Sequence, residues 1–320
     1  MSKSLKIGDL EVKIPVVQGG MGVGISLSGL AGNVSACGGL GVISTAQIGW
    51  REPDFYEKPF EANFRAIEKE IKKARELAKG GVLGVNIMVA TQRYEEYVKS
   101  AVKAGIDIII SGAGLPIDLP KYVEGSKTKI APIVSSLKSL TVICRMWERK
   151  YQTAPDLVVI EGPKAGGHLG FSREELETVT DEAYDDVIVS IIEKVKEYSE
   201  KFSKKIPVVV AGGIYERKDM DHVMKLGADG VQMGTRFVTT KECDADEAYK
   251  QSYIKAKKED IKIVQSPVGM PGRAILNPFL EKVKTEKCKI KHCYQCIVTC
   301  DKKTIPYCIT EALVNAAEGR

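Results

Sequence analysis

The feature that most constrains the fold of this chain is a regular alternation of short apolar runs with longer amphipathic stretches. The apolar runs are continuous, which is typical of parallel strands that are buried on both faces. We expect eight such strands, at residues 14–18, 40–44, 82–88, 106–111, 130–135, 157–161, 206–211 and 230–233. The clearest helical patterns fall between them, at residues 63–79, 93–104, 183–202 and 217–226.

Eight strand–helix units in about 240 residues predict a closed (β/α)8 barrel, or TIM barrel. An open, doubly wound parallel sheet is the alternative that the same alternation allows. We expect an α/β chain with the barrel over residues 1–240, a helical and loop extension over 241–285 that packs on it, and a C-terminal cysteine-rich tail over 286–320. Residues 49–60 look like an irregular insertion, 245–258 like a charged helix, and 266–273 form a Pro/Gly-rich segment.

Charge and hydropathy exclude several classes of protein. The net charge is +5 over 320 residues, and no basic stripe is interleaved with aromatic residues, so we expect no binding of nucleic acid. The first residues lack the apolar core of a signal peptide, and no window approaches the roughly 20 apolar residues of a membrane span. We therefore expect a cytoplasmic protein without membrane contact.

The ends of the predicted strands carry residues that suit a large ligand. In a (β/α)8 barrel the active site lies at the C-terminal ends of the strands and in the loops that follow. Nearly all of these positions are glycine or uncharged polar residues: Gln18 to Gly22, Asn86, Ser111 to Gly114, Ala211 to Gly213 and Gln232 to Thr235. Such a surface fits a planar, phosphate-bearing ligand that is bound by backbone amides.

Two glycine pairs predict where the phosphate binds. Gly212 and Gly213 follow the seventh strand, and Gly234 and Thr235 follow the eighth, where barrels commonly bind phosphate. Backbone N–H groups can bind a dianion there without a lysine. The alternative is that these glycines only form tight turns. The glycines at 20, 22 and 24 are not a dinucleotide fingerprint, because no acidic residue ends the second strand.

His168 is the candidate acid/base. It is one of three histidines and lies in a glycine-rich segment after the sixth strand, which we expect to be flexible. Imidazole suits proton transfer near neutral pH, so we expect a general acid/base or a donor that orients the substrate. Glu161 ends the same strand as either a ligand acceptor or a structural carboxylate. The chain has no serine triad, HExxH or Walker motif, which argues against hydrolysis and phosphoryl transfer.

Over most of residues 14–237 the chain resembles the nitronate monooxygenase family, formerly the 2-nitropropane dioxygenases, and the related FMN-dependent enoyl-acyl-carrier-protein reductases. The segment from Glu161 to His168 is closer to the reductase form of its motif. The resemblance rests on Pro15-Val-Val-Gln-Gly-Gly-Met21, Gly84-Val-Asn-Ile87, Ser111-Gly-Ala-Gly114, Glu161-Gly-Pro-Lys-Ala-Gly-Gly-His168, Ala211-Gly-Gly-Ile214 and Gln232-Met-Gly-Thr-Arg-Phe237.

The resemblance implies an FMN-dependent oxidoreductase with flavin at the barrel mouth and His168 as the catalytic residue. In the monooxygenases the histidine acts on a carbon acid; in the reductases NAD(P)H is the reductant and the histidine helps to bind or protonate an enoyl thioester. A small-molecule or acyl-thioester substrate and a homodimer are expected. The implied cofactor-binding residues are Gly20, Met21, Asn86, Glu161, Gly167, Gly212, Gly213, Gln232, Met233, Gly234 and Thr235.

Five of the eight cysteines lie in the tail, between Cys288 and Cys308. In a cytoplasmic chain such a cluster suggests metal or redox chemistry. The spacing differs from a zinc ribbon and is similar to that of iron–sulfur proteins, so an iron–sulfur cluster is the leading interpretation, with zinc, free thiols or disulfides as alternatives. The candidate ligands are Cys288, Cys293, Cys296 and Cys300, with Cys308 as an alternative.

Two further functions remain open from the residues alone. One is a barrel enzyme without redox chemistry that binds a sugar or nucleotide phosphate at the same glycines. The other is a flavin and iron–sulfur electron-transfer protein that has no substrate of its own.

Overall fold

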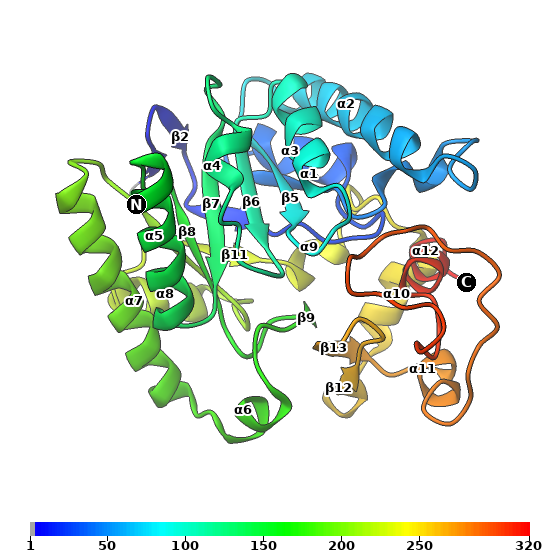
Figure 1. Cartoon of the computed structure of the whole chain (residues 1–320). Coiled ribbons are helices and arrows are strands. Elements are labelled where there is room, and N and C mark those ends of the chain that lie inside the picture. Colours follow the sequence, from blue (N-terminus) through cyan, green and yellow to red (C-terminus); the bar gives the residue numbers. More distant parts are fainter. Residues whose placement is uncertain (1–3) are drawn as a thin grey trace.

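The computed structural model describes residues 4–320, and its centre is a barrel of eight parallel strands (Figure 1). Around the barrel the strand order is β3-β11-β10-β8-β7-β6-β5-β4. The predicted TIM barrel is therefore confirmed. Its strands are β3 (Val16–Gln18), β4 (Gly41–Ser44), β5 (Leu83–Met88), β6 (Ile108–Gly112), β7 (Lys129–Val134), β8 (Val158–Glu161), β10 (Val208–Ala211) and β11 (Gly230–Met233).

The strands at the two ends of this order, β3 and β4, pair with each other and so close the sheet. The N–H of Gln18 donates to the carbonyl of Leu40 at 2.9 Å, and the N–H of Leu40 donates to the carbonyl of Val16 at 2.9 Å. Val17 and Leu40 form a parallel bridge. A sheet whose first and last strands pair has no free edge, so the open, doubly wound alternative is wrong.

Helices cover the outside of the barrel. Successive residues of a strand face opposite sides: Leu157 and Val159 belong to the core inside the barrel, whereas Val158 and Ile160 belong to the core beneath the helices. The covering helices are α1 (Ser28–Ala36), α2 (Pro59–Ala78), α3 (Tyr94–Lys103), α4 (Leu119–Tyr122), α5 (Leu137–Tyr151), α7 (Asp181–Lys201), α8 (Arg217–Lys225) and α9 (Thr235–Val238). An antiparallel hairpin, β1 (Leu5–Ile7) and β2 (Leu10–Val12), packs its buried residues into the inner core.

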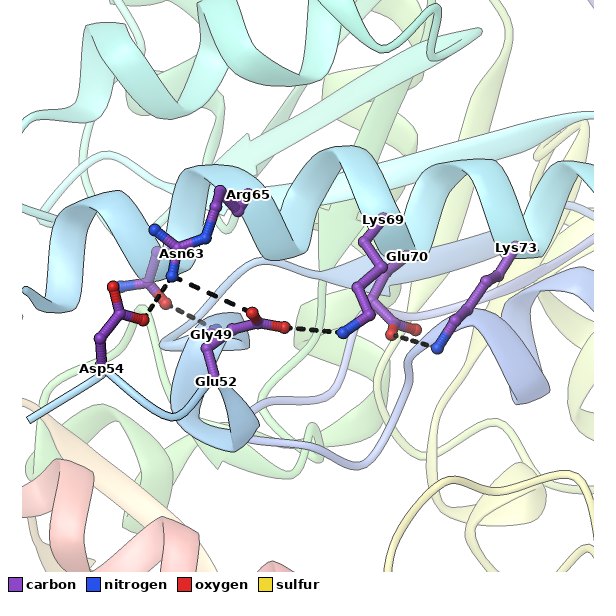
Figure 2. Close-up of polar contacts among 8 residues, drawn as sticks. All are labelled: Gly49, Glu52, Asp54, Asn63, Arg65, Lys69, Glu70 and Lys73. Atoms are coloured by element: carbon purple, nitrogen blue, oxygen red, sulfur yellow. Dashed lines mark hydrogen bonds and ion pairs between the residues drawn. The ribbon is translucent and has the colours of Figure 1, made fainter.

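The predicted insertion at 49–60 contains the short 3-10 helix η1 (Ile48–Arg51), which lies against α2. The N–H of Gly49 donates to Asn63 Oδ1 at 2.7 Å, and Lys69 pairs with Glu52 at 2.9 Å (Figure 2). A Cβ on Gly49 would lie 2.4 Å from the backbone of Ala62. Glycine thus allows the insertion to lie directly on the helix, and polar contacts fix it there.

The chain after the barrel folds into further elements beside the barrel mouth (Figure 1). The predicted helix at 245–258 is shorter, and the Pro/Gly-rich segment at 266–273 contains the turn of a β-hairpin. These elements are α10 (Glu247–Lys255), η2 (Lys258–Asp260), β12 (Ile261–Gln265), β13 (Pro271–Ile275), α11 (Pro278–Lys282) and α12 (Ile309–Ala317).

The carboxylate of Asp244 connects this later part of the chain to the barrel. It accepts hydrogen bonds from the N–H groups of Leu27 at 2.7 Å and of Gly29 and Leu30 at 3.0 Å each. These groups form the N-terminus of α1, which offers no capping side chain of its own. The first helix of the barrel is therefore capped by a residue more than 200 positions later in the chain.

The cysteine-rich tail packs against the insertion and against the loop that follows β5. The ring of Tyr294 stacks on that of Phe55 at 5.2 Å between centroids. Ile297 forms an antiparallel bridge with Thr91, just beyond the C-terminal end of β5. The tail therefore lies at the mouth end of the barrel. None of the helices described for residues 4–320 has the length and apolar character that crossing a membrane requires.

Candidate active site

The loop that follows β3 contacts β5 and the loop that follows β11 at glycines. A Cβ on Gly20 would lie 2.4 Å from Cβ of Asn86, and a Cβ on Gly234 would lie 3.5 Å from Sδ of Met21. Four of the predicted ligand-binding residues are thus brought together from three separate strands. A fifth residue of the predicted set, Gln232, lies beside Gly19, where a Cβ would be 3.2 Å from the Gln232 side chain.

The loops after β8 and β10 form the neighbouring part of the rim. Gly212 and Gly213 both have positive φ values, 97° and 79°, which only glycine adopts without strain. A Cβ on Gly212 would lie 2.8 Å from the backbone of Gly162. Gly213 and Thr235 are exposed. The predicted phosphate-binding glycines therefore present accessible backbone where two adjacent strands end.

Two cations lie beside these glycines. A Cβ on Gly213 would lie 2.9 Å from the side chain of Lys164, which pairs with Asp181 at 2.7 Å. The guanidinium of Arg236 lies 4.8 Å from the centre of the Tyr215 ring. Neither cation was predicted as a phosphate ligand from the sequence, although Lys164 lies within the segment from Glu161 to His168 and Arg236 directly follows Thr235.

Glu161 ends β8 with a carboxylate that is poorly hydrogen-bonded. Its Oε1 is buried and has no partner among the described residues. Burial raises the pKa of Glu161 to about 7, although the N–H of Gly170 donates to the carboxylate. Since a buried polar atom without a partner is rare, this oxygen marks a place where a ligand's donor would be accommodated.

His168 lies in a two-residue strand within the glycine-rich segment. Together with Gly167 it forms β9 (Gly167–His168), which pairs with β13 in the register Gly272 to His168. Its Nε2 lies 2.7 Å from Oγ of Ser266, in the turn between β12 and β13. Burial lowers the pKa of His168, so the neutral imidazole is favoured.

Arg273 on β13 binds the loop between Glu161 and His168. Its guanidinium donates to the carbonyls of Pro163 at 2.7 Å and Ala165 at 2.6 Å. Arg273 and Ser266 could not be predicted from the sequence, because no motif connects them to the loop that carries His168. The one signal was their position in a Pro/Gly-rich segment that the barrel pattern does not explain.

Four of the five candidate metal-binding cysteines lie around one cavity, and the fifth does not. Cys293, Cys296, Cys300 and Cys308 line one small cavity in the tail, whereas Cys288 does not line it. All are free cysteines. Within residues 4–320 no three His, Cys, Asp or Glu side chains are placed so that they could hold a single metal ion. The cavity thus brings together three of the four predicted ligands and the predicted alternative.

Comparison with known proteins shows the family to which the chain belongs. The family described as nitronate monooxygenase matches residues 3–319. A probable nitronate monooxygenase of Staphylococcus saprophyticus is 26% identical over 299 residues, which cover 86% of this chain and 79% of that protein. The structure of FabK from Thermotoga maritima is similar with a TM-score of 0.66 and 28% identity, covering 85% of this chain and 74% of that one.

Nitroalkane oxidase from Streptomyces ansochromogenes has the same fold, with a TM-score of 0.64 at 21% identity over 84% of this chain and 78% of that one. The family match extends over nearly the whole chain and includes every strand of the barrel. The protein is therefore an enzyme and belongs to the nitronate monooxygenase family of flavin-dependent oxidoreductases.

Proposed function

We propose that this enzyme is an FMN-dependent oxidoreductase in which His168 acts as acid/base on a nitronate or on an enoyl thioester. One observation carries this proposal. The loop that runs from Glu161 to His168 at the barrel mouth has a buried carboxylate oxygen without a hydrogen-bond partner at one end and the imidazole of His168 at the other. Family membership supports a flavin enzyme.

The residues at the mouth fit FMN. The buried Oε1 of Glu161 can accept from a ring N–H. Gly213 and Thr235 offer exposed backbone to the phosphate, with Lys164 and Arg236 nearby as cations. When bound, FMN supplies the redox chemistry, while the protein supplies orientation and electrostatics. The proposed binding set also includes Met21, Asn86, Gly167, Gly212, Gln232 and Met233.

His168 moves the proton in this proposal. Because burial lowers its pKa, the imidazole is neutral at pH 7 and can either accept a proton from a carbon acid or return one to a substrate carbon. The hydrogen bond to Ser266 orients the ring and leaves the other nitrogen for the substrate. Arg273 keeps the loop in place by binding two of its carbonyls.

Two substrate classes are compatible with this chemistry. A nitronate is a carbon acid, and the similarity to probable nitronate monooxygenases favours it. An enoyl thioester with NAD(P)H as co-substrate is favoured by the reductase-like form of the motif from Glu161 to His168 and by 28% identity to FabK.

Anaerobic stopped-flow spectroscopy separates the two classes. The enzyme is mixed either with NAD(P)H or with a nitronate, and flavin absorbance is followed. Bleaching by NAD(P)H supports the reductase reaction, and bleaching by the nitronate alone supports the monooxygenase reaction. A colourless protein that does not bind added FMN would contradict the proposal and favour a barrel enzyme without redox chemistry. Flavin that reacts with neither would favour an electron-transfer protein.

A further inference from the structure

The tail gathers four thiols around one space. Cys293, Cys296, Cys300 and Cys308 all line one small cavity, with a volume of about 30 Å³. Cys288, although its N–H donates to the carbonyl of Pro306 at 2.7 Å, does not line the cavity.

The backbone turns so that neighbouring cysteines face the same space. Gln295, between Cys293 and Cys296, has a left-handed φ of 50°. The turn is anchored to the barrel, because the N–H of Gln92 donates to the carbonyl of Cys296 at 3.2 Å and the N–H of Val298 donates to that of Ala90 at 2.9 Å. The cavity is therefore part of the folded enzyme and lies beside the loop after β5.

Hydrogen-bond donors are directed at two of the sulfurs. The hydroxyl of Thr310, a residue that is only 2% exposed, donates to Cys296. The N–H groups of Thr310 and Glu311, in the first turn of α12, donate to Cys308. Hydrogen bonds to cysteine sulfur are a regular feature of iron–sulfur sites.

Other groups of the cavity lack a partner. Nε2 of His292 is buried and has no hydrogen-bond partner among the described residues, and Lys302 contributes a cation to the lining. The cavity therefore brings a histidine and a cation beside the four cysteines.

A single metal ion does not fit this arrangement. Zinc needs four ligands at about 2.3 Å from one point, and the described residues present no three side chains so placed. A cluster of several irons needs its four sulfurs farther apart, around a space. We propose that Cys293, Cys296, Cys300 and Cys308 hold an iron–sulfur cluster, with Cys308 rather than Cys288 as the fourth ligand. This site is additional to the proposed flavin chemistry and independent of it.

The test begins with protein that is purified without oxygen and reconstituted with iron and sulfide. Iron, acid-labile sulfide, zinc and FMN are then measured per chain. We expect iron and sulfide in equal amounts, about two to four of each, and an electron paramagnetic resonance signal after reduction with dithionite. Zinc without sulfide, or no metal after reconstitution, would overturn the proposal. FMN is measured separately, so failure here leaves the flavin proposal intact.

The ligand assignment is tested by three serine variants. Cys308→Ser and Cys300→Ser should each lose the cluster signal and most of the iron, while FMN stays bound. Cys288→Ser is the matched control, because it removes a thiol of the same tail that does not line the cavity, and it should keep both. Loss of the cluster in Cys288→Ser, or its full retention in Cys308→Ser and Cys300→Ser, would overturn the assignment.

Discussion

Nε2 of His168 and Oγ of Ser266 lie 2.7 Å apart, although 98 positions separate them in the chain. The histidine comes from the barrel and the serine from the β12–β13 turn, so the extension completes the active site. The backbone pairing of β9 with β13 fixes the same relationship a second time. The barrel alone would therefore leave its candidate acid/base without an orienting partner.

Ser266→Ala should slow turnover without releasing FMN. A hydrogen bond of this kind contributes about 0.5–1.5 kcal/mol, so we expect kcat to fall roughly 2- to 10-fold. The pH at which kcat falls to half should also shift, because the ring loses its partner. Ser190→Ala on α7 is the control and should leave both unchanged. An unaltered kcat and pH profile in Ser266→Ala would remove Ser266 from the positioning of His168.

The acid side of the pH profile should report His168. Burial lowers its pKa below the ordinary value of 6.5, so the neutral form persists to lower pH than in a free histidine. If neutral imidazole is required, kcat/KM is constant above about pH 6.5 and falls as the pH drops through the lowered pKa. The profile of His168→Gln should lack this fall. A fall that persists in the variant would assign it to another group.

FMN affinity should rise with pH through Glu161. Its pKa is raised to about 7 by burial, and a donor from FMN would favour the carboxylate and lower that pKa in the complex. Affinity should therefore be constant above about pH 7 and fall by up to about tenfold per unit below it.

Glu161→Gln provides the control for this titration. The variant retains the phosphate-binding residues but cannot ionise at position 161, so its affinity should lose this part of the pH dependence. Fluorescence titration of the apoprotein with FMN at several pH values measures both proteins. Identical pH dependence in the two would contradict a role for the Glu161 carboxylate in binding.

Asp244→Ala should destabilise the whole enzyme. The change leaves three N–H groups of the α1 N-terminus without their acceptor, and we expect a loss of about 2–4 kcal/mol in the free energy of unfolding. Asp246→Ala removes a cap that accepts one bond from Ala248 and should cost about 1 kcal/mol. Denaturant unfolding compares them, and equal losses would contradict the role of Asp244.

The barrel could be predicted from the sequence because its strands are short, continuous apolar runs that alternate with amphipathic stretches. All eight predicted strands are present, and none of their ends differs from the predicted one by more than two residues. The ends of those strands also predicted the rim, because the barrel topology places Gly20, Asn86 and Gly234 at one edge and the structure brings them together.

The extension could not be predicted in the same way. The β12–β13 hairpin contains a Pro/Gly-rich turn that has no strand pattern, and its pairing with β9 depends on a strand of two residues. Ser266, Arg273 and Asp244 act through single long-range contacts. Such contacts leave no periodicity in the sequence, so only the folded chain shows them.

The most direct test of the account is the turnover of His168→Ala. The variant is purified with its FMN, and reaction with the substrate class identified for the wild type is followed by anaerobic stopped-flow. We predict that FMN remains bound and that turnover falls at least about a hundredfold, the usual scale of general acid/base catalysis. Wild-type turnover in His168→Ala would contradict the assignment of His168 as the acid/base of this enzyme.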